Sequence, residues 1–360
     1  MAGLVFLEDG TVYCGEAFGA HATASGELVF NTSMIGYQEV LSDPVCSGQV
    51  INMTYPIIGS CGISTEGNES DHIHARGLIA RYISDSSYHY SSIDTIDSWL
   101  KKNNVPGVSG VDTRSITKKI RSIGTCKCVI STEGISPGEA AALCGRTELR
   151  SDCMKTAGTS KTVHIEGKGS RVALFDFGAS KSFINILMQK DCDIYLFPYT
   201  SKAEEILSVR PDGIILSGGP GDPKAATEAV AEVSRLLNGY IPVFGVGLGH
   251  QIMALSSGGK TYKLKFGHRG GNHGVFDKIS GCSYIVSQNH GYAVNAESVI
   301  SKGMEITHVN LNDGTVEGMR HIKLPFLSVQ FYPGNSPESH GSSYPVNRFI
   351  DLMKGGKGNA

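Results

Sequence analysis

The stretch PVFGVGLGHQIMAL, residues 242–255, predicts a strand, a tight turn and a helix in direct succession. Its apolar run, 242–246, is typical of a buried strand, and a helical pattern runs from Leu248 to the glycine pair at 258–259. The turn spells G-x-G-x-G and has the form of a nucleophile elbow, which lifts one side chain above a sheet. A serine or cysteine is expected at the apex, but the residue there is Gly247. The sequence therefore predicts an elbow that carries no nucleophile.

Strand and helix patterns alternate on the amino-terminal side of this elbow. The predicted strands are 171–178, 193–199 and 212–219, and the predicted helices are 180–191, 201–210 and 225–239. Such repeated units imply an α/β fold, with a mostly parallel sheet flanked by helices and ligands at the carboxyl ends of the strands. The glycine-rich loop LSGGPGDP (216–223) follows one such end, so we expect it to face the same pocket as Gly247. Its backbone N–H groups suit an oxyanion or a small polar ligand.

Antiparallel β structure is expected after the elbow, in 282–294 and 305–321, with a hairpin turn at 312–314. The first part of the chain differs and predicts a smaller, mixed α/β domain. Its strand-like runs are 4–7, 11–18, 26–31 and 48–56, and its helical segments are 95–103 and 112–124. Asp112 is the expected N-cap of the second helix, and Gly124 ends it. We therefore predict domains at 1–153 and 170–360, joined by a linker at 154–169.

Composition excludes several classes of protein. The formal net charge is −2, with 40% apolar and 18% charged residues, so no global field favours nucleic acid or an anionic membrane. No apolar run is long enough to span a membrane, and the first residues do not resemble a secretory signal. The nine cysteines, an odd number, are then expected to be reduced thiols in a cytoplasmic protein.

Neither a nucleotide site nor a metal site is predicted. The sequence GGKT at 258–261 resembles the end of a P-loop, but Ala254 stands where the leading glycine belongs. His250 likewise breaks a G-x-G-x-x-G pattern that starts at Gly245. The histidine pair at 72 and 74 and the cysteine pair at 126 and 128 have no further ligand at a suitable spacing, so surface or hydrogen-bonded side chains are expected there.

Several of these motifs carry a family resemblance. The loop LSGGPGDP, the stretch 242–273 and SQNHGYAV (287–294) together resemble a class I glutamine amidotransferase domain. In the first half, LEDGTVYCGEAFG (7–19), GELVFNTSMIGYQEVLSDP (26–44) and GVDTRSITKKIR (110–121) resemble the amino-terminal domain of the carbamoyl-phosphate synthase small subunit. The resemblance covers nearly the whole chain.

The resemblance implies a partner and a reaction. In that family the small subunit hydrolyses glutamine, and ammonia passes through an internal tunnel to a large subunit. The large subunit uses ATP and bicarbonate to make carbamoyl phosphate for arginine and pyrimidine synthesis. The resemblance therefore implies a heterodimer with a large subunit. It implies no cofactor in this chain, because ATP and Mg²⁺ belong to the large subunit.

The family's catalytic residues are absent from this sequence. The family has a cysteine at the elbow, where Gly247 stands, and a late Q-G-H-P-E motif that here reads QFYPG, residues 330–334. Tyr332 thus replaces the histidine and Gly334 the glutamate. Amide hydrolysis by this route needs a thiolate, a base for its proton and a group that orients the base. We therefore predict negligible glutaminase activity and a complex that uses free ammonia.

The family's glutamine contacts, in contrast, are retained. They match Ser47, Gly219, Gly221, Leu248, Gln251, Asn289, Gly291 and Tyr292. Phe331 replaces a glycine beside the lost histidine and either fills the space of the missing cysteine or blocks the glutamine pocket. Cys46, next to Ser47, is not expected to substitute as nucleophile, because neighbours on a strand face opposite ways. The alternative functions are a glutamine sensor that does not hydrolyse its ligand and a residual amidotransferase activity.

Overall fold

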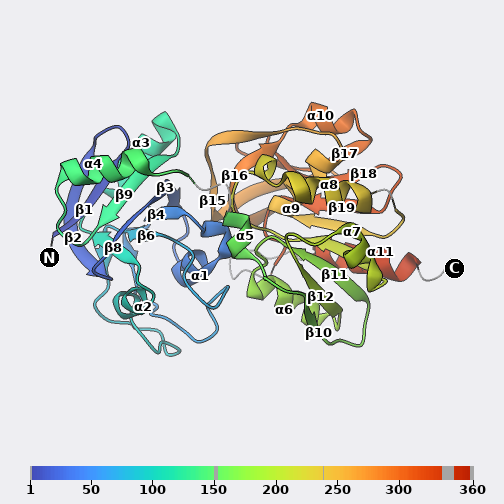
Figure 1. Ribbon diagram of the computed structural model, residues 1–360, viewed down its shortest axis with the longest axis horizontal. Helices are drawn as coiled ribbons and strands as arrows, with labels where there is room; N and C mark the ends of the chain where they lie inside the picture. Colours follow the sequence, from blue (N-terminus) through green and yellow to red (C-terminus); the bar gives the residue numbers. More distant parts are fainter. Residues whose placement is uncertain (1, 150–152, 238, 335–343, 357–360) are drawn as a thin grey trace. The chain divides into compact units, whose positions relative to one another are not determined.

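The computed structural model describes residues 2–149, 153–237, 239–334 and 344–356. The chain forms two compact units, Met1–Arg150 and Ser151–Ala360 (Figure 1). Each unit has its own buried apolar residues, and each is described separately below.

The first unit is built on a closed β-barrel. Around the barrel the strand order is β1-β2-β8-β6-β4-β3-β9. The strands are β1 Ala2–Leu7, β2 Val12–Gly19, β3 Thr23–Asn31, β4 Gln49–Met53, β6 Gly77–Ile79, β8 Pro106–Ser109 and β9 Cys126–Ser131. A separate two-stranded sheet pairs β5 Ile57–Ile58 with β7 Tyr82–Ile83. Closure removes the free edges that would otherwise invite pairing with other chains.

Helices cover the barrel at several points. They are α1 Tyr37–Ser42, the 3-10 helix η1 Pro44–Cys46, α2 Ile96–Lys102, α3 Thr113–Ile123 and α4 Pro137–Arg146. The predicted limits of α3 are confirmed, because Asp112 Oδ1 accepts a hydrogen bond from Ser115 N (2.9 Å) and Gly124 has φ +98°. The mixed α/β character predicted for this half is also confirmed.

The second unit contains one ten-stranded sheet. Its order is β10-β12-β11-β13-β14-β19-β18-β17-β15-β16. The strands are β10 Val163–Ile165, β11 Arg171–Asp176, β12 Asp193–Pro198, β13 Gly213–Leu216, β14 Val243–Val246, β15 Thr261–Asp277, β16 Ser283–Val294, β17 Met304–Asn310, β18 Val316–His321 and β19 Phe326–Val329. The five strands from β12 to β19 run parallel, and the remaining neighbours pair antiparallel. The predicted α/β class and the antiparallel last third are confirmed.

Helices bury both faces of this sheet. They are α5 Cys153–Ala157, α6 Lys181–Gln189, α7 Ala203–Ser208, the 3-10 helix η2 Pro223–Ala225, α8 Thr227–Leu236, α9 Leu248–Ser256, α10 Ala296–Ile300 and α11 Tyr344–Gly356. Apolar side chains of α7, α8 and α9 join one buried cluster, and those of α6 and α11 join another. The two clusters explain why the central strands are apolar throughout, as the sequence pattern predicted.

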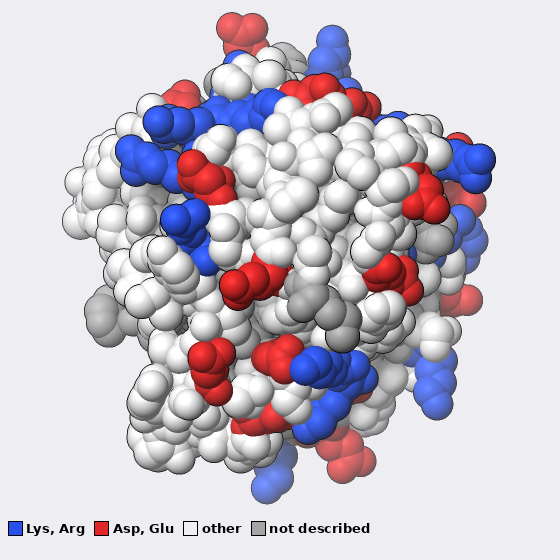
Figure 2. All heavy atoms as spheres, turned by 90° about the vertical axis from the view of Figure 1, so that its left-hand side faces the viewer, with Lys and Arg blue, Asp and Glu red and all other residues white. Residues whose placement is uncertain are grey.

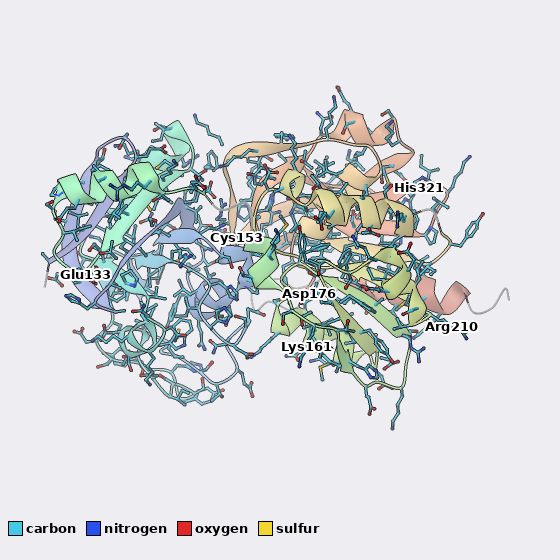
Figure 3. The ribbon with its side chains drawn as sticks, viewed as in Figure 1. Glu133, Cys153, Lys161, Asp176, Arg210 and His321 are labelled. Carbon is cyan, nitrogen blue, oxygen red and sulfur yellow. The ribbon has the colours of Figure 1, made fainter. Side chains whose placement is uncertain are left out.

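The segment predicted as a linker, 154–169, contains most of α5 and all of β10, which pairs with β12. Asp176, at the end of β11, holds this segment with its carboxylate (Figure 3). Its Oδ2 accepts from Thr159 N (2.7 Å), and its Oδ1 accepts from Gly178 N and Ala179 N. These contacts use backbone atoms and one carboxylate, so apolar periodicity does not reveal them.

The predicted hairpin turn at 312–314 joins β17 to β18. Gly314 has φ +71°, and its N–H donates to Asn310 O at 3.0 Å. The turn therefore forms where the Asn-Asp-Gly sequence placed it.

Charge on the visible surface is mixed. Figure 2 shows acidic and basic side chains interspersed around a broad uncharged area on one face. Among the helices within the described ranges, none is long and apolar enough to cross a membrane.

Close packing of α9 on the sheet depends on Gly249. A Cβ at this position would overlap the carbonyl oxygen of Leu216, at the end of β13. We expect Gly249→Ala to lower the free energy of unfolding of the second unit by at least about 2 kcal/mol, because the helix must shift. Gly145→Ala in α4 is the matched control, since a Cβ there meets nothing within 4 Å. It should raise stability by about 0.5–1 kcal/mol. Urea unfolding followed by circular dichroism measures both, and equal stability of Gly249→Ala and wild type would contradict the packing argument.

Candidate functional site

The predicted elbow forms between β14 and α9. Gly247 lies at the apex with φ +53° and ψ −109°, a combination that side-chain-bearing residues rarely adopt. Its N–H donates to Val329 O on the neighbouring strand β19 (2.9 Å), which fixes the turn. The strained backbone of a nucleophile elbow is thus present although the nucleophile is not. Glycine is the residue that adopts it at least cost.

The apex has room for a Cβ. An ideal Cβ on Gly247 would have two heavy atoms within 4 Å among the described residues, chain neighbours aside. These are Gly218 Cα at 3.6 Å and Gln330 O at 3.9 Å, both at ordinary contact distance. The same distances place the glycine-rich loop beside the elbow, as predicted.

Backbone geometry in that loop favours a polar ligand. A Cβ at Gly219 would overlap the carbonyl oxygen of Phe177, and Gly221 has φ +96°, so both positions require glycine. Ser217 anchors the loop by accepting from Phe177 N (2.8 Å) through its hydroxyl. Leu248, the first residue of α9, has a backbone N–H with no acceptor inside the helix. These groups are suited to an oxyanion.

The two late substitutions, Tyr332 and Gly334, depend on each other. A Cβ at Gly334 would overlap the ring of Tyr332, so the tyrosine ring occupies the place of any larger residue there. The Tyr332 hydroxyl donates to Ser182 Oγ at 2.7 Å, and Tyr332 N donates to Ser287 O at 3.0 Å. Tyr332 is therefore a packed and hydrogen-bonded residue of this unit.

Phe331 lies in the apolar core. It is 2% exposed, packs in the cluster that includes residues of α6 and α11, and meets the ring of His308 edge-on with centroids 5.5 Å apart. No Phe331 atom lies within 4 Å of an ideal Cβ at Gly247, so the ring does not contact the first atom of a side chain at the apex.

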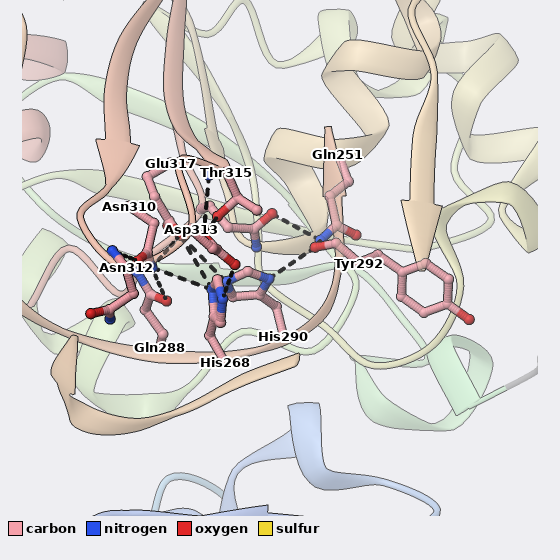
Figure 4. A network of polar contacts seen from close by, with 11 residues as sticks. Gln251, His268, Gln288, His290, Tyr292, Asn310, Asn312, Asp313, Thr315 and Glu317 are labelled. Carbon is pink, nitrogen blue, oxygen red and sulfur yellow. Dashed lines mark hydrogen bonds and ion pairs between the residues drawn. The ribbon is translucent and has the colours of Figure 1, made fainter. Parts of the chain in front are cut away.

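Gln251 links the elbow helix to two other elements. Its Nε2 donates to Gln330 Oε1 (2.9 Å) and to the carbonyl oxygen of Tyr292 (3.0 Å) (Figure 4). On β16, a Cβ at Gly291 would lie 3.2 Å from Arg269 Nη2, and Asn289 pairs in register with Arg269. The structure therefore connects Gln251 with Tyr292, on the strand that also carries Asn289 and Gly291.

Ser47 belongs to the first unit and caps the C-terminus of η1. Its Oγ lies 2.9 Å from His74 Nδ1, which accounts for one of the two histidines at 72 and 74. Cys46 is 1% exposed and packs in the apolar core of that unit. The strand alternation invoked for Cys46 is wrong, because residues 44–46 form a 3-10 helix, but its thiol is buried all the same.

Sequence reasoning missed one polar cluster in the second unit. His268, His290 and Glu317 are all buried, and their potential ligand atoms lie within 4.8 Å of one another. Burial opposes ionisation of Glu317, but its interaction with the two neighbouring imidazoles holds the pKa of that carboxyl below its usual value. The three residues come from β15, β16 and β18, so no local spacing could have signalled them.

Comparison with known proteins agrees with this geometry. Residues 173–352 match the family "Glutamine amidotransferase class-I", and residues 5–130 match "Carbamoyl-phosphate synthase small chain, CPSase domain". The chain is 51% identical over 352 residues to the carbamoyl phosphate synthase small chain of Clostridium acetobutylicum, covering 98% of this chain and 100% of that one. It is 42% identical over 353 residues to the small chain of Oceanobacillus iheyensis, covering 98% and 96%. The chain therefore belongs to the carbamoyl-phosphate synthase small-chain family, with a class I glutamine amidotransferase domain as its second half.

Proposed function

We propose that this chain is the small subunit of a carbamoyl-phosphate synthase and no longer hydrolyses glutamine. It docks on a large subunit, which then makes carbamoyl phosphate from free ammonia. Family membership over the whole chain supports the subunit role, and the match of residues 5–130 extends it to the amino-terminal unit.

One observation carries the loss of hydrolysis, namely an intact elbow with Gly247 at its apex. Glycine offers no nucleophile, and a tyrosine hydroxyl with a pKa near 10 is a poor base at neutral pH. The hydroxyl of Tyr332 is moreover bonded to Ser182. Loss of a nucleophile alone lowers such rates by several orders of magnitude.

Two other side chains of the second unit, Cys192 and His250, are poorly suited to replace the lost groups. Burial raises the pKa of the Cys192 thiol to about 11, and burial lowers the pKa of His250, three residues beyond the apex, to about 3. His250 Nδ1 is also bonded to Ser328 Oγ (2.8 Å). A thiol that stays protonated is a poor nucleophile, and a histidine of such low basicity is a poor base.

A second candidate function is glutamine sensing. It is favoured by the glycine-rich loop beside Gly247, where Gly219 leaves no room for a Cβ and Gly221 has φ +96°. Binding without cleavage would let glutamine alter the activity of the partner. A residual amidotransferase activity ranks last, because it lacks a nucleophile.

Calorimetry of the purified chain with L-glutamine, with ammonia assayed in the same sample, tests the proposal. We expect heat of binding with L-glutamine, little with D-glutamine, and ammonia no higher than in buffer. Gly218→Val is the matched variant, because a Cβ there meets nothing within 4 Å and the residue lies beside the apex. It should fold and weaken binding at least about tenfold, or ~1.4 kcal/mol. No binding and no ammonia would leave only the subunit role, whereas ammonia well above background would overturn the loss of hydrolysis.

A further inference from the structure

Two histidines and a glutamate converge inside the second unit, and the proposal above assigns them no role. Figure 4 shows the rings of His268 and His290 directed toward Glu317. His268 Nδ1 lies 3.5 Å and His290 Nε2 lies 3.8 Å from Glu317 Oε1. Glu317 is 0% exposed, and the two histidines are 6% and 7% exposed. The cluster is therefore shielded from bulk water.

In each histidine, the hydrogen bond of the ring nitrogen that does not face Glu317 determines which nitrogen carries the proton of the neutral ring. His290 Nδ1 lies 2.9 Å from the carbonyl oxygen of Tyr292, which can only accept, so Nδ1 carries the proton. His268 Nε2 lies 2.9 Å from Asp313 Oδ2, a carboxylate that likewise accepts. In the neutral rings the lone pairs of His268 Nδ1 and His290 Nε2 thus face the Glu317 carboxylate. In that state three acceptors point at one another, which is relieved either by a proton on one imidazole or by a cation bound between them.

The surrounding groups supply little of that positive charge. Asn310 Nδ2 lies 3.2 Å from Glu317 Oε1 and 3.4 Å from His268 Nδ1, at the long end of the hydrogen-bonding range. Among the described residues, His290 Nε2 and Glu317 Oε2 are buried and have no hydrogen-bond partner. Buried polar atoms without partners are rare in native proteins, and a bound ion is one way in which such atoms are satisfied.

The donor set and its supports match those of a transition-metal site. Zinc binds imidazole nitrogen and carboxylate oxygen at about 2.0–2.2 Å, which separates neighbouring ligand atoms by about 3.3 Å. The two separations from Glu317 Oε1, 3.5 and 3.8 Å, are close to this value, and all three ligand atoms lie within 4.8 Å of one another. Histidine ligands usually donate their second N–H to a carboxylate or a carbonyl, as His268 does to Asp313 and His290 to Tyr292. Asp313 is itself held by Thr315 N and Oγ1 at 3.1 and 2.8 Å.

We propose that His268 Nδ1, His290 Nε2 and the Glu317 carboxylate bind a divalent transition metal, for which Zn²⁺ is the best match. Imidazole ligands argue against Mg²⁺ and Ca²⁺, which prefer oxygen. The ion joins β15, β16 and β18, and it fixes the strand that carries Asn289 and Gly291. It acts as a structural cross-link of the antiparallel part of the sheet.

Zinc retention by the full chain tests the site. The protein, free of any metal-binding tag, is stripped with a chelator, given excess Zn²⁺, desalted and assayed for metal by mass spectrometry. We expect about one zinc per wild-type chain, and a rise in Tm of about 5–10 °C when zinc is present at a hundredfold excess over its Kd. Glu317→Gln, which keeps the shape of the side chain, and His290→Ala should lose both the metal and the Tm rise.

Two further variants distinguish loss of the zinc site from misfolding and from nonspecific zinc binding. Asp313→Asn leaves all three ligands in place and should weaken zinc binding by about 10–100-fold. His164→Ala is the matched control, since His164 pairs with Asp193 at 2.6 Å in the same unit but has no third ligand in the described structure. It should retain zinc as wild type does. The site is refuted if wild type keeps no zinc, or if Glu317→Gln and His290→Ala keep as much as wild type.

Discussion

The variant that combines Gly247→Cys, Tyr332→His and Gly334→Glu will release ammonia from glutamine at least about 10³-fold faster than Gly247→Cys alone. A thiol at the apex is a weak nucleophile until a base takes its proton, and that base needs a third group to orient it. The three residues act as a unit, so the single cysteine recovers little of the rate.

The structure explains why the late pair must change together. The apex can hold a cysteine, since its Cβ would lie at ordinary contact distances, although the φ of +53° costs about 1–3 kcal/mol of strain. A glutamate at 334 cannot fit while the ring of Tyr332 occupies its place. Tyr332→His frees that space at the cost of the hydrogen bond to Ser182, about 0.5–1.5 kcal/mol. Phe331 stays unchanged, because truncating a buried phenylalanine costs about 3–5 kcal/mol.

A matched control distinguishes the effect of the thiol from the effect of the other two substitutions. The variant Gly247→Ala/Tyr332→His/Gly334→Glu has the same late pair and the same strained apex but no thiol, and it should release no ammonia above buffer. Ammonia from a coupled enzymatic assay at saturating glutamine measures all the variants, after circular dichroism shows that each is folded. Equal rates for Gly247→Cys and the triple variant would contradict the account of the site given above.

Local patterns in the sequence predicted the elements that depend on local chemistry. Helix α3 begins after Asp112 and ends at Gly124, and the Asn-Asp-Gly turn joins β17 to β18. Apolar runs mark the parallel strands. The order of strands around the barrel could not be read in the same way, because it depends on pairing between distant segments. Strand β10 escaped prediction for a similar reason, since its partner on β12 supplies what its own short sequence lacks.

In the candidate site, too, the features set by local sequence were predictable and those set by contacts between distant residues were not. The elbow at Gly247 and its glycine loop were predictable, because a tight turn and a close backbone approach each demand glycine at fixed positions. The mutual dependence of Tyr332 and Gly334 was not predictable. It arises because the Tyr332 ring occupies the space that a Cβ at Gly334 would need. The cluster of His268, His290 and Glu317 was also hidden, because three strands contribute one residue each.

The second large effect is expected in the assembled synthase. Mixed with a large subunit of the same source, the chain should form a complex that makes carbamoyl phosphate from ammonium ions, ATP and bicarbonate. With glutamine in place of ammonium, the rate should be at least about 10³-fold lower, because no nucleophile is present to release ammonia. Carbamoyl phosphate is measured by trapping it in a coupled reaction, and complex formation by size-exclusion chromatography.

The triple variant makes this experiment sharper, because it changes the ammonia supply and leaves the first unit unaltered. If ammonia can still reach the large subunit from the elbow, the triple variant will restore synthesis from glutamine, while the alanine control will not. Restored hydrolysis without glutamine-dependent synthesis would mean that the route between the two sites is closed in this chain. Synthesis from glutamine by the wild-type complex at a rate near that with ammonium would refute the loss of hydrolysis. Failure to form any complex would refute the subunit role, since the amino-terminal unit would then have no partner to meet.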